Sequence, residues 1–274
     1  MQTETPYVHG YSPRESRRLG DQADTLAQLL HAGTAYPAGS RVLEVGCGVG
    51  AQTVHLVGAS PDAELVSIDI SADSLAAARA RVTAEHPGAR VDWQRADLFE
   101  LPFKDNSFDH VFVCFVLEHV REPERALAAL KRVLRPGGTI TVIEGDHRSA
   151  LFHPDSRYAQ ATVDCLIQLQ RTAGGDGLIG RRLQPLLSSA GFLDVVVRPR
   201  TVYVDDTRPD LVDGFIRNTF IAMVESVRPD ALAAGLITRA DWDRGLADLH
   251  RTAAGGGTFH YLFFKAVAIN TASR

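Results

Sequence analysis

The 274-residue sequence contains few cysteines and no recognisable set of metal ligands. Its three cysteines are widely spaced and lie outside any C-x-x-C pattern; they are Cys47, Cys114 and Cys165. A disulfide framework and a cysteine zinc site are therefore both unexpected. The ten histidines show no H-x-x-x-H or other ligand spacing, so no metal is expected either.

Positive charge is also scarce and scattered. The formal net charge is −4 and no cluster of five or six Lys or Arg residues occurs, whereas nucleic-acid binding requires a positive surface. No stretch approaches the roughly 18 apolar residues of a membrane span. Residues 1–20 are polar, unlike a signal peptide. These absences predict a cytoplasmic protein with no membrane span and no nucleic-acid partner. They favour a small-molecule substrate and leave a homo-oligomer open.

Short apolar runs alternate with helical stretches between residues 41 and 144. Expected strands cover 41–45, 64–69, 91–93, 108–114 and 139–143, and expected helices cover 71–85 and 122–134. Ser71 is the expected N-cap of the first of these helices. Strands that alternate with helices in this way predict a mostly parallel sheet with helices on both faces. The fold class is therefore α/β and Rossmann-like.

The flanking segments complete a single domain, residues 1–274, with seven strands. Further helices are expected before residue 35, near 156–171, at 180–190 and across 207–250, and further strands at 193–197 and 259–268. Thr238 begins an acidic variant of a capping box. Residues 146–180 and 207–257 are therefore expected to be helical insertions on a core of residues 40–145. The second insertion directly precedes the last strand.

A glycine-rich segment, residues 46–50, ends the first expected strand. Glycines have no Cβ atom, so backbone amides can approach a ligand at the open edge of such a sheet. Asp69 ends the second strand, where a carboxylate can accept both hydroxyls of a ribose. The two features favour a bound nucleoside. They fit NAD and S-adenosylmethionine (SAM) equally well, and a tight turn without a ligand is the plainer alternative.

Further motifs follow at regular intervals. The full set comprises 42–50, Asp69, 96–97, 101–103, 107–109, 117–119 and 134–138. Over roughly residues 40–145 the sequence resembles the class I SAM-dependent methyltransferases, in particular the branch near the ubiquinone and menaquinone C-methyltransferases. Several motifs in order and at this spacing are far more specific than any one of them.

The resemblance implies a set of cofactor contacts. In chain order they are Tyr11, Gln22, Glu44, Gly46, Cys47, Gly48, Gly50, Asp69, Ile70, Asp97, Leu98, Phe115 and Val116. Glu44 would face the methionine amino group of SAM, Asp69 would bind the ribose, and Asp97 would meet the adenine. Tyr11 and Gln22 belong to an N-terminal lid helix region, residues 1–35, that would close over the cofactor. The product would be S-adenosyl-L-homocysteine (SAH).

Two histidines are the candidate catalytic residues. His147 follows the fifth strand at the ligand-binding edge, and histidine suits proton transfer at neutral pH. His147 is therefore the preferred general base, and His119 is the second candidate. Both have plainer explanations. His147 can be a loop residue bonded to Asp146 or to water, and His119 can close the loop after the fourth strand.

The expected reaction is methyl transfer to carbon or oxygen of a small lipophilic metabolite, such as a quinone, an isoprenoid or a specialised natural product. Apolar residues of the insertions would cap this substrate, or they would simply pack as helix core. These residues are Phe152, Tyr158, Leu166, Phe215, Phe220 and Met223. An NAD(P)-dependent oxidoreductase is the main alternative, although it leaves motifs 117–119 and 136–138 unexplained. A non-catalytic SAM-binding protein is the other, because a fold alone does not establish a function.

Overall fold

The computed structural model describes residues 13–271, with side chains from Arg18 onwards, and its strands form one sheet. The order across the sheet is β3-β2-β1-β4-β5-β7-β6, and only β7 runs antiparallel to its neighbours. The strands are β1 (Arg41–Val45), β2 (Glu64–Asp69), β3 (Val91–Arg95), β4 (Phe108–Cys114), β5 (Leu134–His153), β6 (Leu193–Val204) and β7 (Thr258–Ile269). The expected seven-stranded, mostly parallel sheet is confirmed.

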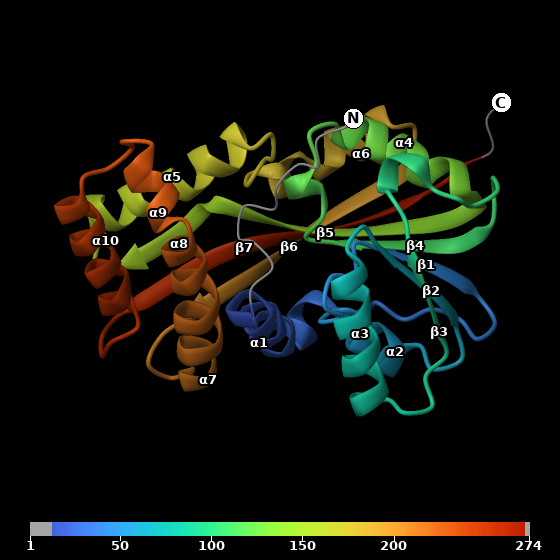
Figure 1. Cartoon of the computed structure of the whole chain (residues 1–274), viewed down its shortest axis with the longest axis horizontal. Helices are drawn as coiled ribbons and strands as arrows, with labels where there is room; N and C mark the ends of the chain where they lie inside the picture. The colour runs from blue at the N-terminus through green and yellow to red at the C-terminus, as the bar shows by residue number, and fades with distance from the viewer. Residues whose placement is uncertain (1–12, 272–274) are drawn as a thin grey trace.

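Helices cover both faces of this sheet (Figure 1). Successive residues of a strand point to opposite faces, and Phe112 and Val113 of β4 accordingly belong to different apolar cores. One core contains α4 and α6, and the other contains α1, α5 and the helices before β7. The helices are α1 (Pro13–Leu30), α2 (Thr53–Ala59), α3 (Ala72–Glu85), α4 (Pro123–Val133), α5 (Arg157–Thr172), α6 (Leu183–Ser189), α7 (Pro209–Leu211), a π-helix (Val212–Ile221), α8 (Ala222–Ser226), α9 (Arg228–Ala233) and α10 (Arg239–Thr252).

Two expected side-chain caps set the starts of their helices. The Ser71 hydroxyl accepts a hydrogen bond from the Ser74 amide at 3.2 Å, and α3 begins at the next residue. The Thr238 hydroxyl accepts one from the Asp241 amide at 3.1 Å, and α10 follows. Each cap satisfies an amide of the first turn that has no partner inside the helix. Both predictions made from the local sequence are therefore confirmed.

β5 is much longer than the expected strand at 139–143. The prediction ended there because residues 144–149 are mostly polar, yet Glu144, Asp146 and His147 are all buried and bonded within the protein. A register shift lies between Asp146 and Leu151, and β5 then continues along β7. The predicted strand at 193–197 is likewise shorter than β6, which pairs with β7 as far as Val204. These long strands extend well beyond β1–β4 and support the helices of the insertions (Figure 1).

The first helix and the second insertion pack directly on each other. Gly214 of the π-helix lies so close to α1 that a Cβ atom there would be 2.2 Å from the Thr25 hydroxyl oxygen. Real Cβ contacts are essentially never this short, so a side chain at residue 214 would force the Thr25 side chain or the helix to shift. The N-terminal helix and the insertion thus share one interface. No helix between residues 13 and 271 is long and apolar enough to cross a membrane.

Candidate active site at the carboxyl edge of the sheet

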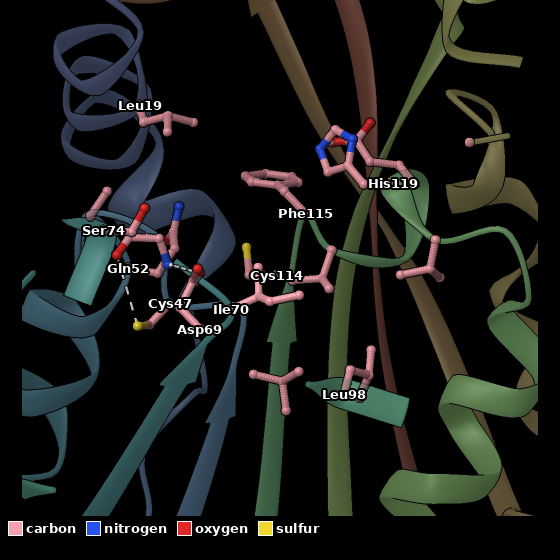
Figure 2. Close-up of a pocket in the computed structure, with 18 of the residues that line it drawn as sticks. Leu19, Cys47, Gln52, Asp69, Ile70, Ser74, Leu98, Cys114, Phe115 and His119 are labelled. Atoms are coloured by element: carbon pink, nitrogen blue, oxygen red, sulfur yellow. Dashed lines mark hydrogen bonds and ion pairs between the residues drawn. The ribbon is translucent and has the colours of Figure 1, made fainter. Parts of the chain in front are cut away.

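A cavity of about 1070 Å³ opens where β1, β2 and β4 end. This is the switch point of the strand order, where open α/β sheets bind ligands. Cys47 and Asp69 lie on one side of the cavity, and Phe115 and His119 lie on the other (Figure 2). Single ligand sites in proteins typically measure about 300–1,000 Å³. This cavity therefore lies at the upper end of that range.

The glycine loop forms one wall of the cavity. Gly46, Gly48 and Gly50 have φ values of +66°, +52° and +76°, which side chains rarely adopt. A Cβ atom at Gly46 would also lie 2.6 Å from a methyl group of Val116, so the loop and the chain after β4 approach at van der Waals distance. Gly46, Cys47, Gly48 and Val116 line the cavity as expected.

Gly50 lies behind the cavity wall, although it was expected to contact the cofactor. It does not line the cavity, and a Cβ atom there would lie 2.8 Å from the Cα atom of Ala78 on α3. The absence of a side chain lets α3 pack against the loop. Gly50 therefore fixes the position of the loop from behind and is not itself a wall of the cavity.

Asp69 holds the loop through its carboxylate. One oxygen accepts a hydrogen bond from the Gly48 amide at 2.9 Å, and the other accepts one from the Ser71 amide at 2.8 Å. Burial raises the pKa of Asp69, while these amide donors lower it. Asp69 lines the cavity, as does Ile70, whose side chain is 43% exposed. The carboxylate retains lone pairs for a ligand, since each oxygen can accept more than one hydrogen bond.

Asp97 and Leu98 line the cavity at the end of β3. One carboxylate oxygen of Asp97 accepts a hydrogen bond from the Phe99 amide at 2.8 Å, which fixes the short 3₁₀ turn Leu98–Glu100. An acidic acceptor beside an apolar side chain suits a flat base with an amino group at its edge. The structure thus brings these two residues to the same cavity as Asp69, as the motif order implied.

Phe115 adopts a backbone conformation that is rare for a residue with a side chain. Its φ is +57°, which costs on the order of 1–3 kcal/mol for a non-glycine residue. The turn is held by the Phe115 amide, which donates to the Ile143 carbonyl at 2.9 Å. Its ring contacts that of Phe263, with centroids 5.5 Å apart, and lines the cavity. Strain of this kind is found where a side chain must face a ligand.

Glu44 lies beneath the glycine loop instead of in the cavity wall. One carboxylate oxygen accepts hydrogen bonds from the hydroxyls of Thr53 at 2.8 Å and Ser67 at 2.7 Å. Burial raises the pKa of Glu44 to about 7. The expected contact with a methionine amino group is therefore not seen for this side chain. Its hydrogen bonds instead tie β1 to β2 and α2, and they position the loop.

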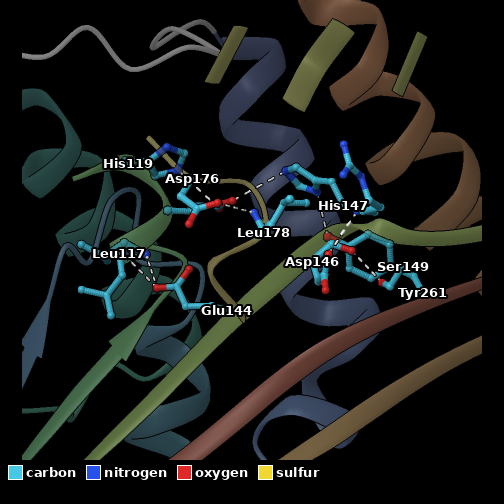
Figure 3. Close-up of polar contacts among 12 residues, drawn as sticks. Leu117, His119, Glu144, Asp146, His147, Ser149, Asp176, Leu178 and Tyr261 are labelled. Atoms are coloured by element: carbon cyan, nitrogen blue, oxygen red, sulfur yellow. Dashed lines mark hydrogen bonds and ion pairs between the residues drawn. The ribbon is translucent and has the colours of Figure 1, made fainter. Parts of the chain in front are cut away.

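A buried polar cluster of Glu118, His147, Gln170 and Tyr261 lines the deeper part of the cavity. His147 Nδ1 lies 2.8 Å from the Tyr261 hydroxyl (Figure 3). His147 Nε2 lies 3.7 Å from a carboxylate oxygen of Glu118. The other oxygen of Glu118 lies 3.4 Å from His119 Nε2. Both predicted histidines therefore flank one carboxylate, on opposite sides.

Burial dominates the electrostatics of this cluster. It raises the pKa of Glu118, although the nearby His147 and Arg18 oppose this effect. It lowers the pKa of His147, against the opposing effect of Glu118. Glu144, which is fully buried behind the cluster, has a pKa well above the usual range, and its carboxylate accepts from the amides of Val116 and Leu117. Burial thus brings the pKa values of Glu118 and His147 towards each other, which favours proton exchange between the two groups.

Some of the cavity residues were missed or misplaced by sequence reasoning. Glu118 belongs to a quoted motif but was not singled out, and Gln170 and Arg18 carry no local signal at all. Gln22 lines the cavity as expected, and its amide oxygen accepts from the Arg18 guanidinium at 3.1 Å. Tyr11 lies outside the described residues.

An aromatic wall completes the cavity and consists of Phe115, Phe215, Phe220 and Phe263. Phe215, Phe220 and Met223 were expected there and do line the cavity. The other three expected apolar residues do not line it. Tyr158 and Leu166 pack as part of helix α5, and Phe152 packs on strand β5, where its ring stacks on that of Phe259.

The residues around the loop fit SAM, and they define a cofactor half of the cavity: Gly46, Cys47, Gly48, Asp69, Ile70, Asp97 and Leu98. The backbone cradle that a Cβ atom at Gly46 would fill is one part of the fit, and the half-buried carboxylate of Asp69 is another. The Phe115 ring suits a sulfonium cation, because aromatic faces attract positive charge. Within residues 13–271 no group of three His, Cys, Asp or Glu side chains is arranged to hold a metal ion.

The expectation that the sequence has no Tyr-x-x-x-Lys pair, which counted against the oxidoreductase alternative, is wrong. Tyr261 and Lys265 form a Tyr-x-x-x-Lys spacing. They lie on β7, where four residues span about 13 Å, and their side chains serve separate structures. Tyr261 bonds to His147, whereas Lys265 donates to the end of α1. The pair is therefore not assembled as one catalytic unit.

Comparison with known proteins agrees with the fit of the cavity to SAM. Residues 43–142 match the family described as a methyltransferase domain. A 37.1 kDa uncharacterized protein in a transposon of Streptomyces fradiae is 36% identical over 222 residues, covering 76% of this chain and 61% of that protein. The O-methyltransferase cnsE of Penicillium expansum is 33% identical over 61% of this chain and 64% of its own length. The ubiquinone/menaquinone biosynthesis C-methyltransferase UbiE of Dinoroseobacter shibae is 40% identical over 39% of this chain and 43% of its own length.

The chain spans less than two thirds of the length of these relatives. Among solved structures, the fold is shared with Haemonchus contortus phosphoethanolamine N-methyltransferase 2 in complex with SAH. That likeness has a TM-score of 0.55 and 20% identity over 90% of this chain and 53% of the other.

The sheet and its cavity define a Rossmann-like nucleoside-binding protein. With the family match, residues 43–142 are a methyltransferase domain of the class I SAM-dependent family.

Proposed function

We propose that the protein transfers a methyl group from SAM to a small, largely apolar acceptor. The observation that carries the proposal is one cavity with two unlike parts. The cofactor half lies around Asp69, and the remainder is built from the aromatic wall and the buried polar cluster. When bound, SAM supplies an electrophilic methyl group on a sulfonium. The relatives named as an O-methyltransferase and a quinone C-methyltransferase support an acceptor methylated at oxygen or carbon.

The residues of the cofactor half have separate roles in this proposal. Asp69 accepts hydrogen bonds from the ribose hydroxyls, and the amides of the glycine loop hold the methionine part. Asp97 and Leu98 flank the base. Glu44 acts through its hydrogen bonds beneath the loop, as a positioning residue. Gln22 covers the cofactor from α1, where it is buried and lines the cavity.

The remaining residues exclude water and align the acceptor. Methyl transfer from a sulfonium is an in-line displacement, so correct positioning in a dry cavity supplies much of the rate enhancement. Phe115 and Val116 line the cavity beside the cofactor half. His147 and His119 are the proposed polar contacts of the acceptor side, because both lie against Glu118 in the cavity.

Calorimetry and a transfer assay test this function. SAH should bind the purified protein with one site, and NAD⁺ should not bind detectably. Radiolabelled SAM should then deliver label to members of a panel of lipophilic phenols, quinols and enols, with product masses read afterwards. Tight NAD⁺ binding without SAH binding would contradict the proposal. SAH binding without transfer to any acceptor would instead identify a non-catalytic SAM-binding protein.

A further inference from the structure

A π-helix of ten residues, Val212–Ile221, supplies part of the aromatic wall of the cavity. Backbone hydrogen bonds in a π-helix join residues five apart, whereas those of an α-helix join residues four apart. π-Helices are rare and frequently occur at functional sites. The wider turn changes which side chains of the segment share one side of the helix, and so it changes which of them face the cavity.

The π turn brings Phe215 and Phe220 to the same side of the helix. In an α-helix, with about 3.6 residues per turn, two residues five apart point about 140° away from each other. In the π-helix they lie nearly one above the other, and both line the cavity. The opposite side carries Asp213, Arg217 and Asn218, which are all exposed. The wide turn therefore adds a second ring, that of Phe220, to the cavity wall.

Both rings pack against a row of aromatic side chains on β7. The Phe220 centroid lies 4.7 Å from that of Phe259 and 5.8 Å from that of Tyr261. The Phe215 centroid lies 5.7 Å from that of Tyr261 and 5.9 Å from that of Phe263. Phe215 and Phe220 are each 1% exposed, since neighbouring side chains cover nearly all of their surface. The packed rings therefore close the cavity at this end.

The closed end is also apolar. Elsewhere along the cavity the lining residues Ile70 and Arg121 are exposed, so the cavity opens to the surface there. Among the packed rings, the Thr219 hydroxyl donates to a carbonyl of its own helix at 2.7 Å, and the Tyr261 hydroxyl lies 2.8 Å from His147 Nδ1. Both hydroxyls are thus engaged within the protein. Burial of a polar ligand group without a partner is costly, so this end favours an apolar group.

We propose that Phe220 is the residue that limits the length of the apolar end of the methyl acceptor. The inference rests on the proposed methyl transfer and deepens it, because it describes the part of the acceptor that does not react. That part is an uncharged hydrocarbon group directed towards the π-helix, while the reacting atom lies towards the cofactor half. Phe220 acts on the choice of acceptor and takes no part in the chemical step.

The space behind Phe220 shows why this one ring sets the limit. Phe259, which the Phe220 ring contacts, is fully buried and does not line the cavity. Truncation of Phe220 would therefore extend the cavity towards Phe259 and into the apolar core of the insertion. An apolar void on the order of 150 Å³ stays dry and can hold a benzene-sized group. Longer acceptors should then become ligands.

A series of 4-alkylphenols, from ethyl to heptyl, measures this limit by titration calorimetry on SAH-saturated protein. For the wild type, each added methylene should raise affinity about fourfold while the chain becomes buried. At one chain length the affinity should then fall at least tenfold. In Phe220→Ala the fall should come at least two carbons later. Phe220→Leu keeps an apolar side chain, should shift the fall by a smaller amount, and decides the matter if the alanine variant does not fold.

Phe192→Ala is the matched control for the loss of a buried ring. Phe192 is 2% exposed, belongs to the apolar core on the other face of the sheet and does not line the cavity. Its variant should show the fall at the wild-type chain length. A second comparison tests the apolar character of the closed end: 4-(4-hydroxyphenyl)butanoate should bind the wild type at least tenfold more weakly than 4-butylphenol, because its carboxylate would have to be buried.

Three results would overturn the inference. They are a fall at the same chain length in the wild type and the Phe220 variants, affinity that does not depend on chain length or is absent for every member, and equal affinity for the butanoate and 4-butylphenol. Each of them leaves the proposed function intact as long as SAH binds. Failure of SAH to bind the folded wild type is the separate result that refutes the proposed function itself.

Discussion

The ammonium group of Lys265 lies 3.2 Å from the carbonyl oxygen of Leu30, so the last strand of the sheet caps the end of α1. It also donates to the Ala32 carbonyl at 2.9 Å and to the Thr34 hydroxyl. The side chain is 5% exposed, and burial lowers its pKa to about 8. The last carbonyls of a helix have no partners within it, and a cation satisfies them well. Since α1 carries Gln22 into the cavity, β7 indirectly supports the ligand site.

Replacement of Lys265 by Met should therefore loosen α1. We expect the free energy of unfolding to fall by on the order of 1–3 kcal/mol, because buried carbonyl oxygens lose their donors. Amide hydrogen exchange should accelerate within residues 22–34, and SAH should dissociate faster. Lys104→Met, at an exposed lysine between β3 and β4, is the control. Unchanged exchange in α1 of the Lys265→Met protein would show that the helix does not depend on this cap.

Gly46→Ala should abolish most SAH binding, because the new Cβ atom would meet Val116 at 2.6 Å on top of the strain of a positive φ. Gly39→Ala isolates the strain alone, since Gly39 has a φ of +75° but no atom within 4 Å of its Cβ position. It should lose stability by about 1 kcal/mol and keep SAH affinity. The double variant Gly46→Ala/Val116→Ala should recover part of the binding. No recovery in calorimetry would mean that the clash is not the cause.

Asp69→Ala should weaken SAH binding by about ten- to a hundredfold. The variant loses the proposed ribose acceptor and also the hydrogen bond to the Gly48 amide at 2.9 Å, so the loop itself relaxes. Glu64→Gln removes a carboxylate from the exposed start of the same strand and should have no effect. Titration calorimetry on folded proteins of equal melting temperature distinguishes these outcomes, and equal affinity in all three proteins would remove Asp69 from the site.

The ionisation of Glu44 should lower stability as pH rises. Its pKa is about 7 in the folded protein and about 4.5 when unfolded, so the fold favours the protonated form. The free energy of unfolding should fall between pH 4.5 and 7, by on the order of 3 kcal/mol in total, and then stay constant. Glu44→Gln should lack this fall. Urea unfolding from pH 5 to 8 measures it, and parallel curves for the two proteins would contradict the prediction.

His31 should act in the opposite direction over nearly the same range. Burial lowers its pKa to about 4, against 6.5 when unfolded, so the fold favours the neutral ring. Stability from this group is complete above pH 6.5 and is lost as pH falls towards 4. His31→Phe keeps the stacking on Phe112 but not the contact with Gln52. Relative to wild type it should be less stable at pH 7.5 and recover at pH 5. A constant difference would exclude the titration.

The cofactor half of the cavity was predictable because short motifs determine it locally. Residues 46–48 follow β1 and Asp69 ends β2, and the carboxyl ends of neighbouring parallel strands meet at one edge. Gln170 was not predictable in this way, since it reaches the cavity only through the packing of α5. Residues 144–149 were misinterpreted for a related reason. Their polar side chains indicate a loop until their buried partners, such as Arg181 for Asp146, are known.

The contact of Gly214 with Thr25 joins the two coverings of the cavity into one piece. α1 lies over the cofactor half, and the π-helix carries Phe215 and Phe220 of the aromatic wall. A movement that opens one of them must carry the other along or break this tight contact. One movement of these two helices would therefore uncover both parts of the cavity. Under the proposed function, departure of SAH and departure of the methylated product are then expected to share one opening event.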